Sequence, residues 1–102
     1  LSTIYVNLNS QYTLKDIRNT LEKFHKKNRF VKILKNNSFI STNDVINTNY
    51  CFISVCKTEY KNKIVILSAI DNLIKGGAGQ AIQNMNLKFD FNELEGLKWR
   101  YY

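Results

Sequence analysis

The sequence of 102 residues predicts an α+β fold, in which helices pack on a mixed, largely antiparallel sheet. Three observations lead to this prediction. Residues 1–8 alternate between apolar and polar side chains, residues 63–70 form a nearly continuous apolar run rich in β-branched side chains, and apolar residues between them recur at helical spacing. A chain of this length has room for one modest domain.

The first strand is predicted at residues 1–8, where the alternation leaves one face to be buried. A helix follows, with Thr13 as its N-cap and Asp16 placed to complete a capping box. We expect this helix to end near Asn28. The apolar stripe that should lie on the sheet consists of Leu14, Ile17, Leu21 and Phe24.

Three more strands complete the predicted sheet. A short strand at residues 30–34 follows the helix, and this order of strand, helix and strand is compatible with a parallel crossover. Residues 50–57 alternate, and the short polar link before residues 63–70 calls for an antiparallel hairpin. Because residues 63–70 lack alternation, we expect them to form a central strand that is covered on both faces.

The net charge of +7 and the pI near 9.5 would ordinarily suggest a polyanionic partner. We discount that suggestion, because the lysines are spread along the chain and the heavy use of Asn, Lys, Ile and Tyr fits an AT-rich coding bias. The densest cationic cluster is interpreted as a solvated helix end and consists of Lys23, Lys26, Lys27 and Arg29. We therefore expect neither a nucleic-acid nor a membrane partner.

The cysteines and the histidine carry no predicted chemistry. Cys51 and Cys56 are an odd number of residues apart on one predicted strand, so they should point to opposite faces and share neither a disulfide nor a metal ion. Free thiols fit a cytoplasmic location. His25 has no nucleophile or metal ligand at a suitable spacing, and we interpret it as a surface residue.

A glycine-rich turn joins the last strand to a second helix. Lys75 is followed by Gly76, Gly77, Ala78 and Gly79, and the helix after this turn should begin with free N–H groups that attract an anion. The spacing matches neither a phosphate-binding loop nor the dinucleotide fingerprint, so the spacing alone favours a plain tight turn.

The literal sequence around this turn is more specific than its spacing. The stretch SAIDNLIKGGAGQAIQNMN resembles the C-terminal signature of the N-acetyl-gamma-glutamyl-phosphate reductases, and LSTIYV, STNDV, NTNYC and ELEGL resemble other parts of that family in the same order. The resemblance implies the C-terminal dimerisation and substrate domain of a semialdehyde-dehydrogenase-like enzyme. Because a strand pattern starts at Leu1 without a lead-in, we expect this domain to be incomplete.

The resemblance also implies a division of the chain. Residues 1–72 would be the remainder of the dimerisation and substrate domain, and the small polar segment 41–49 would help to shape the site. Residues 73–102 would form a turn, a helix and a tail that pack on a missing NADP-binding domain. The helix carries an apolar stripe, which consists of Ala78, Ala81, Ile82, Met85 and Phe89. In a chain cut away from that domain, Ile82, Met85 and Phe89 would either fold onto the local sheet or stay exposed. We expect the isolated chain to be poorly soluble or to oligomerise.

The implied reaction is NADPH-dependent reduction of N-acetylglutamyl 5-phosphate to N-acetylglutamate 5-semialdehyde in arginine biosynthesis, by a homo-oligomeric enzyme. The family's catalytic cysteine and histidine would precede Leu1, so this chain should be inactive alone and contain no catalytic residue. What it would contribute is one wall of the NADP site, and the candidates are Asn72, Lys75, Gly76, Gly77, Ala78, Gly79 and Gln80.

Two other interpretations remain at this point. The charge, the glycine turn and the aromatic, basic tail at residues 98–102 are also compatible with a free-standing basic α/β module that binds nucleotides or RNA, although we prefer a packing role for the tail. Alternatively, the chain is a subunit-interface domain whose glycine turn is purely structural.

Overall fold

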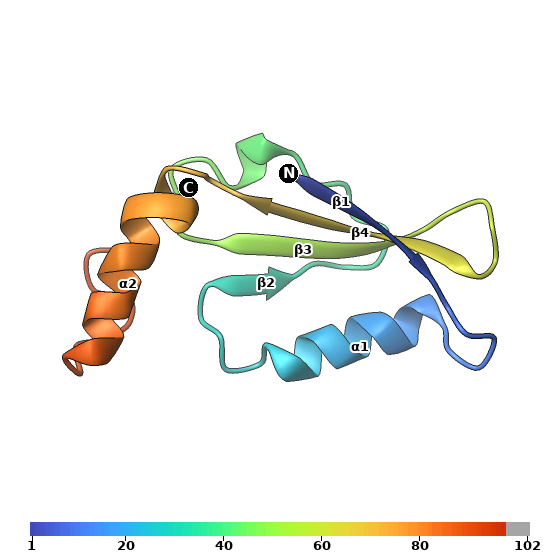
Figure 1. Cartoon of the computed structure of the whole chain (residues 1–102), viewed down its shortest axis with the longest axis horizontal. Helices are drawn as coiled ribbons and strands as arrows, with labels where there is room; N and C mark the ends of the chain where they lie inside the picture. The colour runs from blue at the N-terminus through green and yellow to red at the C-terminus, as the bar shows by residue number, and fades with distance from the viewer. Residues whose placement is uncertain (98–102) are drawn as a thin grey trace.

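A computed structural model describes residues 1–97 of the chain (Figure 1). The elements are β1 (Ser2–Asn7), α1 (Leu14–Phe24), β2 (Val31–Ile33), a single 3-10 turn (Thr42–Asp44), β3 (Cys51–Lys57), β4 (Lys63–Ile70), a π turn (Ile74–Ala78) and α2 (Gly79–Lys88). The predicted role of the aromatic, basic tail falls outside the described residues.

The four strands form one sheet in the order β1-β4-β3-β2. β4 pairs antiparallel with both β1 and β3, whereas β2 pairs parallel with β3. The mixed, largely antiparallel α+β fold, the β3–β4 hairpin and the central position of β4 are therefore confirmed. β1 and β2 run in the same direction at opposite edges of the sheet, so the crossover through α1 spans its whole width (Figure 1).

Local capping explains where α1 begins. The Asp16 amide donates to Thr13 Oγ1 at 3.3 Å, and the Thr13 amide donates to Asp16 Oδ2 at 2.8 Å, which is the predicted capping box. The helix ends at Phe24, earlier than the predicted end near Asn28, because His25 is its C-cap and the amide of Asn28 donates to the His25 carbonyl in a tight turn.

One residue of the predicted α1 stripe does not lie on the sheet. Leu14, Ile17 and Leu21 are half-buried, but Phe24 is 78% exposed and meets only the ring of His25 edge-on, with centroids 4.9 Å apart. The early end of the helix places Phe24 in its last turn, beyond the part that faces β2 and β3. The stripe is therefore one turn shorter than its spacing predicted.

The best-buried apolar cluster connects the loop before β3 to the sheet. It consists of Ile40, Val45 and Ala69, with Leu34, Phe52 and Leu67 packed against it. Coverage of β4 is less complete than its composition predicted, because only Ile64 and Ala69 are buried while residues 65–68 are half-buried. The segment 41–49 thus supplies part of the core despite its polar composition.

Candidate site at the glycine turn

The glycine turn begins at Asp71, directly after β4. Its carboxylate accepts hydrogen bonds from the backbone amides of Asn47 at 2.8 Å, Leu73 at 2.8 Å and Ile74 at 3.3 Å. These bonds favour the ionised form, so the amide of Asn47 first, and then those of Leu73 and Ile74, hold the pKa of Asp71 below its usual value against the opposing effect of burial. Asp71 therefore fastens the turn to the loop before β3.

The turn and α2 are joined by backbone hydrogen bonds, although the chain bends between them at Gly77, whose backbone angles are not helical. The amides of Gly76 and Ala78 donate to the carbonyls of Asp71 and Leu73, each at 3.1 Å, and the amide of Gly79 donates to the carbonyl of Ile74. The prediction that α2 starts with free N–H groups is wrong for Ala78 and Gly79, because the preceding π turn uses them. The donors at the true start of the segment are taken by the Asp71 carboxylate, which leaves less capacity for an external anion.

The predicted cofactor residues divide into an outer and an inner set. The outer set is exposed and consists of Asn72, Gly76, Gly77 and Ala78. Gln80 is half-buried at its border and donates from Nε2 to Asn84 Oδ1 at 3.0 Å. A Cβ atom on Gly77 would meet only the Asn72 carbonyl, at 3.4 Å, so this part of the turn offers an open, nearly side-chain-free surface.

Lys75 and Gly79 form the inner set. The ammonium of Lys75 donates to Gln83 Oε1 at 2.7 Å and lies 5.6 Å from the centre of the Phe30 ring, so its charge is directed away from the exposed turn. Gly79 is buried, and a Cβ atom there would collide with the side-chain oxygen of Asn49 and lie 2.7 Å from the carbonyl of Ile74. Gly79 is therefore required by packing.

A partly buried hydrogen-bond network, here called the inner network, lies behind the turn and consists of Asn49, Lys75, Gln83, Asn86 and Glu93. Gln83 Oε1 also accepts from Asn49 Nδ2 at 2.9 Å, and Gln83 Nε2 donates to Glu93 Oε2 at 2.8 Å. Asn86 Nδ2 donates to the carbonyls of Glu93 and Glu95 at 3.1 and 3.0 Å. Asn49 and Asn86 are each 1% exposed.

Sequence analysis missed four members of the inner network, Asn49, Gln83, Asn86 and Glu93. A signal was present, because Gly79, Gln83 and Asn86 recur at positions i, i+4 and i+7 and so share one face of α2. A search for apolar stripes passes over a small and polar face of this kind. α2 therefore buries its polar face against the rest of the chain.

The flank of α2 next to this polar face is apolar and exposed. Ile82 is 36% exposed, Met85 45% and Phe89 63%, and Leu87 and Phe91 are also exposed nearby. The predicted stripe thus stays outside and does not fold onto the sheet, although the helix lies at the end of the sheet beside β3 and β4 (Figure 1). Exposed apolar side chains gathered on one surface are typical of interaction surfaces.

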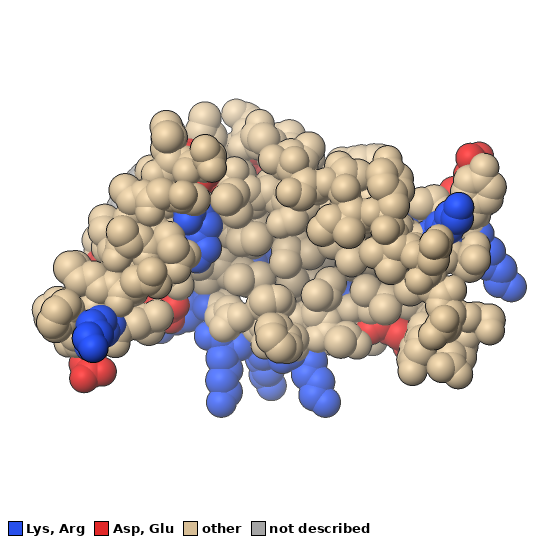
Figure 2. Space-filling model, in the orientation of Figure 1, with Lys and Arg blue, Asp and Glu red and all other residues tan. Residues whose placement is uncertain are grey.

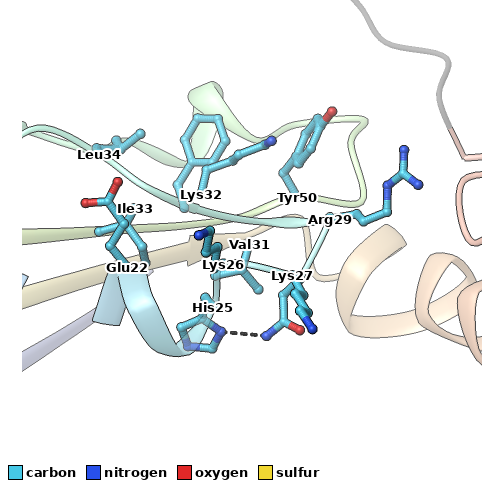
Figure 3. A pocket seen from close by; sticks show the side chains of 12 residues that line it. Glu22, His25, Lys26, Lys27, Arg29, Val31, Lys32, Ile33, Leu34 and Tyr50 are labelled. Carbon is cyan, nitrogen blue, oxygen red and sulfur yellow. Dashed lines mark hydrogen bonds between the residues drawn. The ribbon is translucent and has the colours of Figure 1, made fainter. Parts of the chain in front are cut away.

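The basic cluster lies elsewhere, where α1 ends. Figure 2 shows extended cationic side chains on that side of the molecule. A groove of about 640 Å³ lies there. Figure 3 shows side chains that line it, among them Lys26, Lys27, Arg29 and Lys32 beside Val31 and Tyr50. In this groove the side-chain amide of Asn28 donates from Nδ2 to His25 Nδ1 at 2.8 Å. The groove is separate from the glycine turn.

The remaining features to consider are the two cysteines, possible metal sites and possible membrane-spanning helices. Cys51 and Cys56 are free, half-buried thiols in β3. Within residues 1–97, no group of three or more potential metal ligands comes together, and no helix has the length and apolar character to cross a membrane.

The domain thus combines a mixed sheet, a crossover through α1 and a glycine turn after the central strand. The family model described as "Semialdehyde dehydrogenase, dimerisation domain" matches residues 1–72, and the chain belongs to this family.

Curated relatives extend the similarity through the turn and α2. The chain is 44% identical over 98 residues to the N-acetyl-gamma-glutamyl-phosphate reductase of Halothermothrix orenii, covering 96% of this chain and 28% of that protein. The reductase of the same name from Staphylococcus aureus is 41% identical over 98 residues, covering 96% and 29%. That of Brachyspira hyodysenteriae is 45% identical over 100 residues, covering 97% and 28%. The chain thus spans less than a third of the length of these relatives.

Proposed function

We propose that the chain is the C-terminal part of an NADPH-dependent reductase that converts N-acetylglutamyl 5-phosphate to N-acetylglutamate 5-semialdehyde in arginine biosynthesis. The sequence similarity to reductases of that name supports this assignment over nearly the whole chain. The structural observation that carries it is the orientation of α2, whose polar face is buried while Ile82, Met85 and Phe89 are exposed next to the open turn. Such a surface needs a further domain to cover it.

The proposed division of labour separates the sheet and α1 from the glycine turn and α2. Residues 1–72 form the remaining dimerisation and substrate domain of a homo-oligomer, in agreement with the family to which they belong. Residues 73–102 supply the turn, the helix and the tail that pack on an NADP-binding domain. The carboxylate of Asp71 links the two parts, because it accepts from Asn47 in the first and from Leu73 and Ile74 in the second.

The turn contributes one wall of the cofactor site. NADPH supplies the hydride for such a reduction. The exposed set of Asn72, Gly76, Gly77 and Ala78 fits the uncharged nicotinamide end of the cofactor, because Lys75 directs its charge inward and no Cβ projects from residues 76 and 77. The amides of Asn72 and Gln80 are suited to hydrogen bonds with a carboxamide. Gly79 and Lys75 have indirect roles. The absence of a side chain at Gly79 lets the turn pack against Asn49, and the hydrogen bond from Lys75 to Gln83 holds the turn on α2.

The covalent chemistry requires groups beyond this chain. Reduction of an acyl phosphate in this enzyme class needs a thiolate that displaces phosphate and an acid or base that handles protons. Cys51 and Cys56 lie inside β3, and His25 lies at the end of α1, bonded to Asn28. We therefore expect the chain by itself to be inactive.

A chimera tests the proposal. The chain replaces the matching 98 residues of the Halothermothrix orenii reductase, and reduction of the acyl phosphate is followed by NADPH absorbance. The chimera should be active, whereas the truncated relative without those residues should be inactive. Hydrogen exchange at residues 72–80 should slow when NADPH is added to the chimera and should not change in the isolated chain.

Two results would contradict the proposal. A chimera that folds and binds NADPH without protecting residues 72–80 would remove the turn from the cofactor site. Tight binding of the isolated chain to RNA at physiological salt, weakening steeply as salt is raised, would instead support the basic binding module.

A further inference from the structure

The side chain of Gln83 is the centre of the inner network. Its Oε1 accepts from Lys75 Nζ at 2.7 Å and from Asn49 Nδ2 at 2.9 Å, and its Nε2 donates to Glu93 Oε2 at 2.8 Å. Only one orientation of the amide satisfies two donors on one side and a carboxylate on the other. The network therefore fixes Gln83, and through it the position of Lys75 in the turn.

The network contains one cation and one carboxylate, both bound to the same amide. Burial lowers the pKa of the Lys75 ammonium, while nearby Cys51 and Glu93 oppose that shift. The ring of Phe30, 5.6 Å from the ammonium, adds a favourable cation–π contact. Among residues 1–97, the direct ion pair is Arg18 with Glu22. Lys75 and Glu93 do not touch each other in this way, but both are hydrogen-bonded to Gln83.

The turn itself has little side-chain material to hold its shape. Residues 76 and 77 are both glycine, which leaves more backbone freedom to be lost when the turn is ordered. The side chain of Lys75, directly before them, is anchored on α2, and Glu93 belongs to the segment that follows α2. Three segments of the chain therefore meet behind the exposed residues 76–78.

We propose that the linked side chains of Lys75, Gln83 and Glu93 are a positioning device that sets the glycine turn against the cofactor, with Glu93 as a positioning residue outside the turn. This inference rests on the proposed function. The position of the exposed face of the turn then depends on the carboxylate of Glu93, which lies 17 positions after Gly76 in the sequence. Glu93 itself does not touch the cofactor.

The test uses the full-length reductase with Lys75→Met and Glu93→Gln, each alone and together. Glu93→Gln keeps an acceptor oxygen for Gln83 Nε2 and removes only the charge. The matched controls are Lys88→Met in the last turn of α2 and Glu95→Gln, two residues from Glu93, both at exposed positions. The measurements are kcat and KM for NADPH, the primary deuterium isotope effect with 4-deuterated NADPH, and the thermal midpoint.

Each network variant should lower kcat/KM for NADPH on the order of 10- to 100-fold, as expected when a reacting ring is misplaced. The isotope effect should rise because hydride transfer becomes slower, and the double variant should lose less than the product of the single effects because the side chains act together. The controls should stay within about twofold of the wild type, within the range of surface substitutions.

The inference is overturned if the network variants lower only the thermal midpoint while kcat/KM and the isotope effect match those of the wild type. If Lys75→Met fails to fold, Glu93→Gln carries the same test, since it preserves shape and a hydrogen-bond acceptor. Failure of the proposed function is a different result, because then the wild-type enzyme itself does not oxidise NADPH with the acyl phosphate.

Discussion

The side-chain oxygen of Asn49 occupies the space that a side chain on Gly79 would need. This oxygen is buried and has no hydrogen-bond partner among the described residues, while the Nδ2 of the same amide donates to Gln83. The loop before β3 therefore packs directly against the backbone at the start of α2, and the absence of a Cβ at residue 79 makes that contact possible.

Replacement of Gly79 by alanine should destabilise the chain by about 1–3 kcal/mol, the usual range for overpacking a filled site. Asn49 and the carbonyl of Ile74 would both have to move. Gly77→Ala is the matched control and should change stability by less than about 1 kcal/mol, because its Cβ would meet only the Asn72 carbonyl at ordinary contact distance. Thermal unfolding followed by circular dichroism measures both, and equal effects would contradict the packing argument.

Acid should weaken the hydrogen bonds by which Asp71 fastens the glycine turn to the loop before β3. The pKa of Asp71 is lower in the folded chain than its ordinary value of 3.8, so the folded state binds this proton less readily than the unfolded state. The stabilisation from Asp71 is present above about pH 4 and is lost as the pH falls through the folded pKa. Asp71→Asn should remove this part of the acid sensitivity, as measured by the thermal midpoint between about pH 2 and pH 6. An unchanged acid profile would show that the three backbone bonds are not coupled to folding.

Loss of the α1 cap should cost a measurable part of the stability. Thr13→Ala removes the acceptor for the Asp16 amide and should lower the free energy of unfolding by about 1 kcal/mol. Ser10→Ala, an exposed change in the turn before the helix, serves as the comparison and should have a smaller effect. Urea unfolding measures the difference, and equal midpoints for the two variants would argue against the capping box as a source of stability.

The apolar face of α2 should make the isolated chain self-associate. Met85→Lys together with Phe89→Lys should shift the chain toward monomer in size-exclusion chromatography with light scattering, because both side chains are exposed. Phe24→Lys on α1 is the control, since Phe24 is more exposed than either and lies on a different surface. A wild-type chain that is monodisperse, monomeric and cooperatively melting would contradict this expectation.

Sequence patterns predicted the parts of the fold that depend on local chemistry. Thr13 and Asp16 mark the start of α1 through their own hydrogen bonds, and the short link between β3 and β4 allows little except an antiparallel hairpin. The end of α1 was placed too late, because the turn at His25 depends on backbone bonds that carry no clear residue signature.

The candidate site was predicted by resemblance and only partly by pattern. The glycines at residues 76 and 77 are exposed as a binding turn requires, but the inward course of Lys75 depends on Gln83, which lies two helical turns away. Val45 could not be recognised as core in a polar segment without periodicity, although it is fully buried. Such long-range contacts are decided by how elements meet, and a single sequence does not show that.

The π turn also determines the rotational phase of the helix that follows it. Successive residues of an α-helix are separated by about 100° around the axis, so one extra residue in the turn would place Ile82 and Met85 where Gln83 and Asn86 now lie. The helix α2 would then bury its apolar face against the rest of the chain and expose its amide side chains to solvent. The length of the turn before α2 thus determines whether the apolar or the amide-rich face of this helix is exposed to solvent.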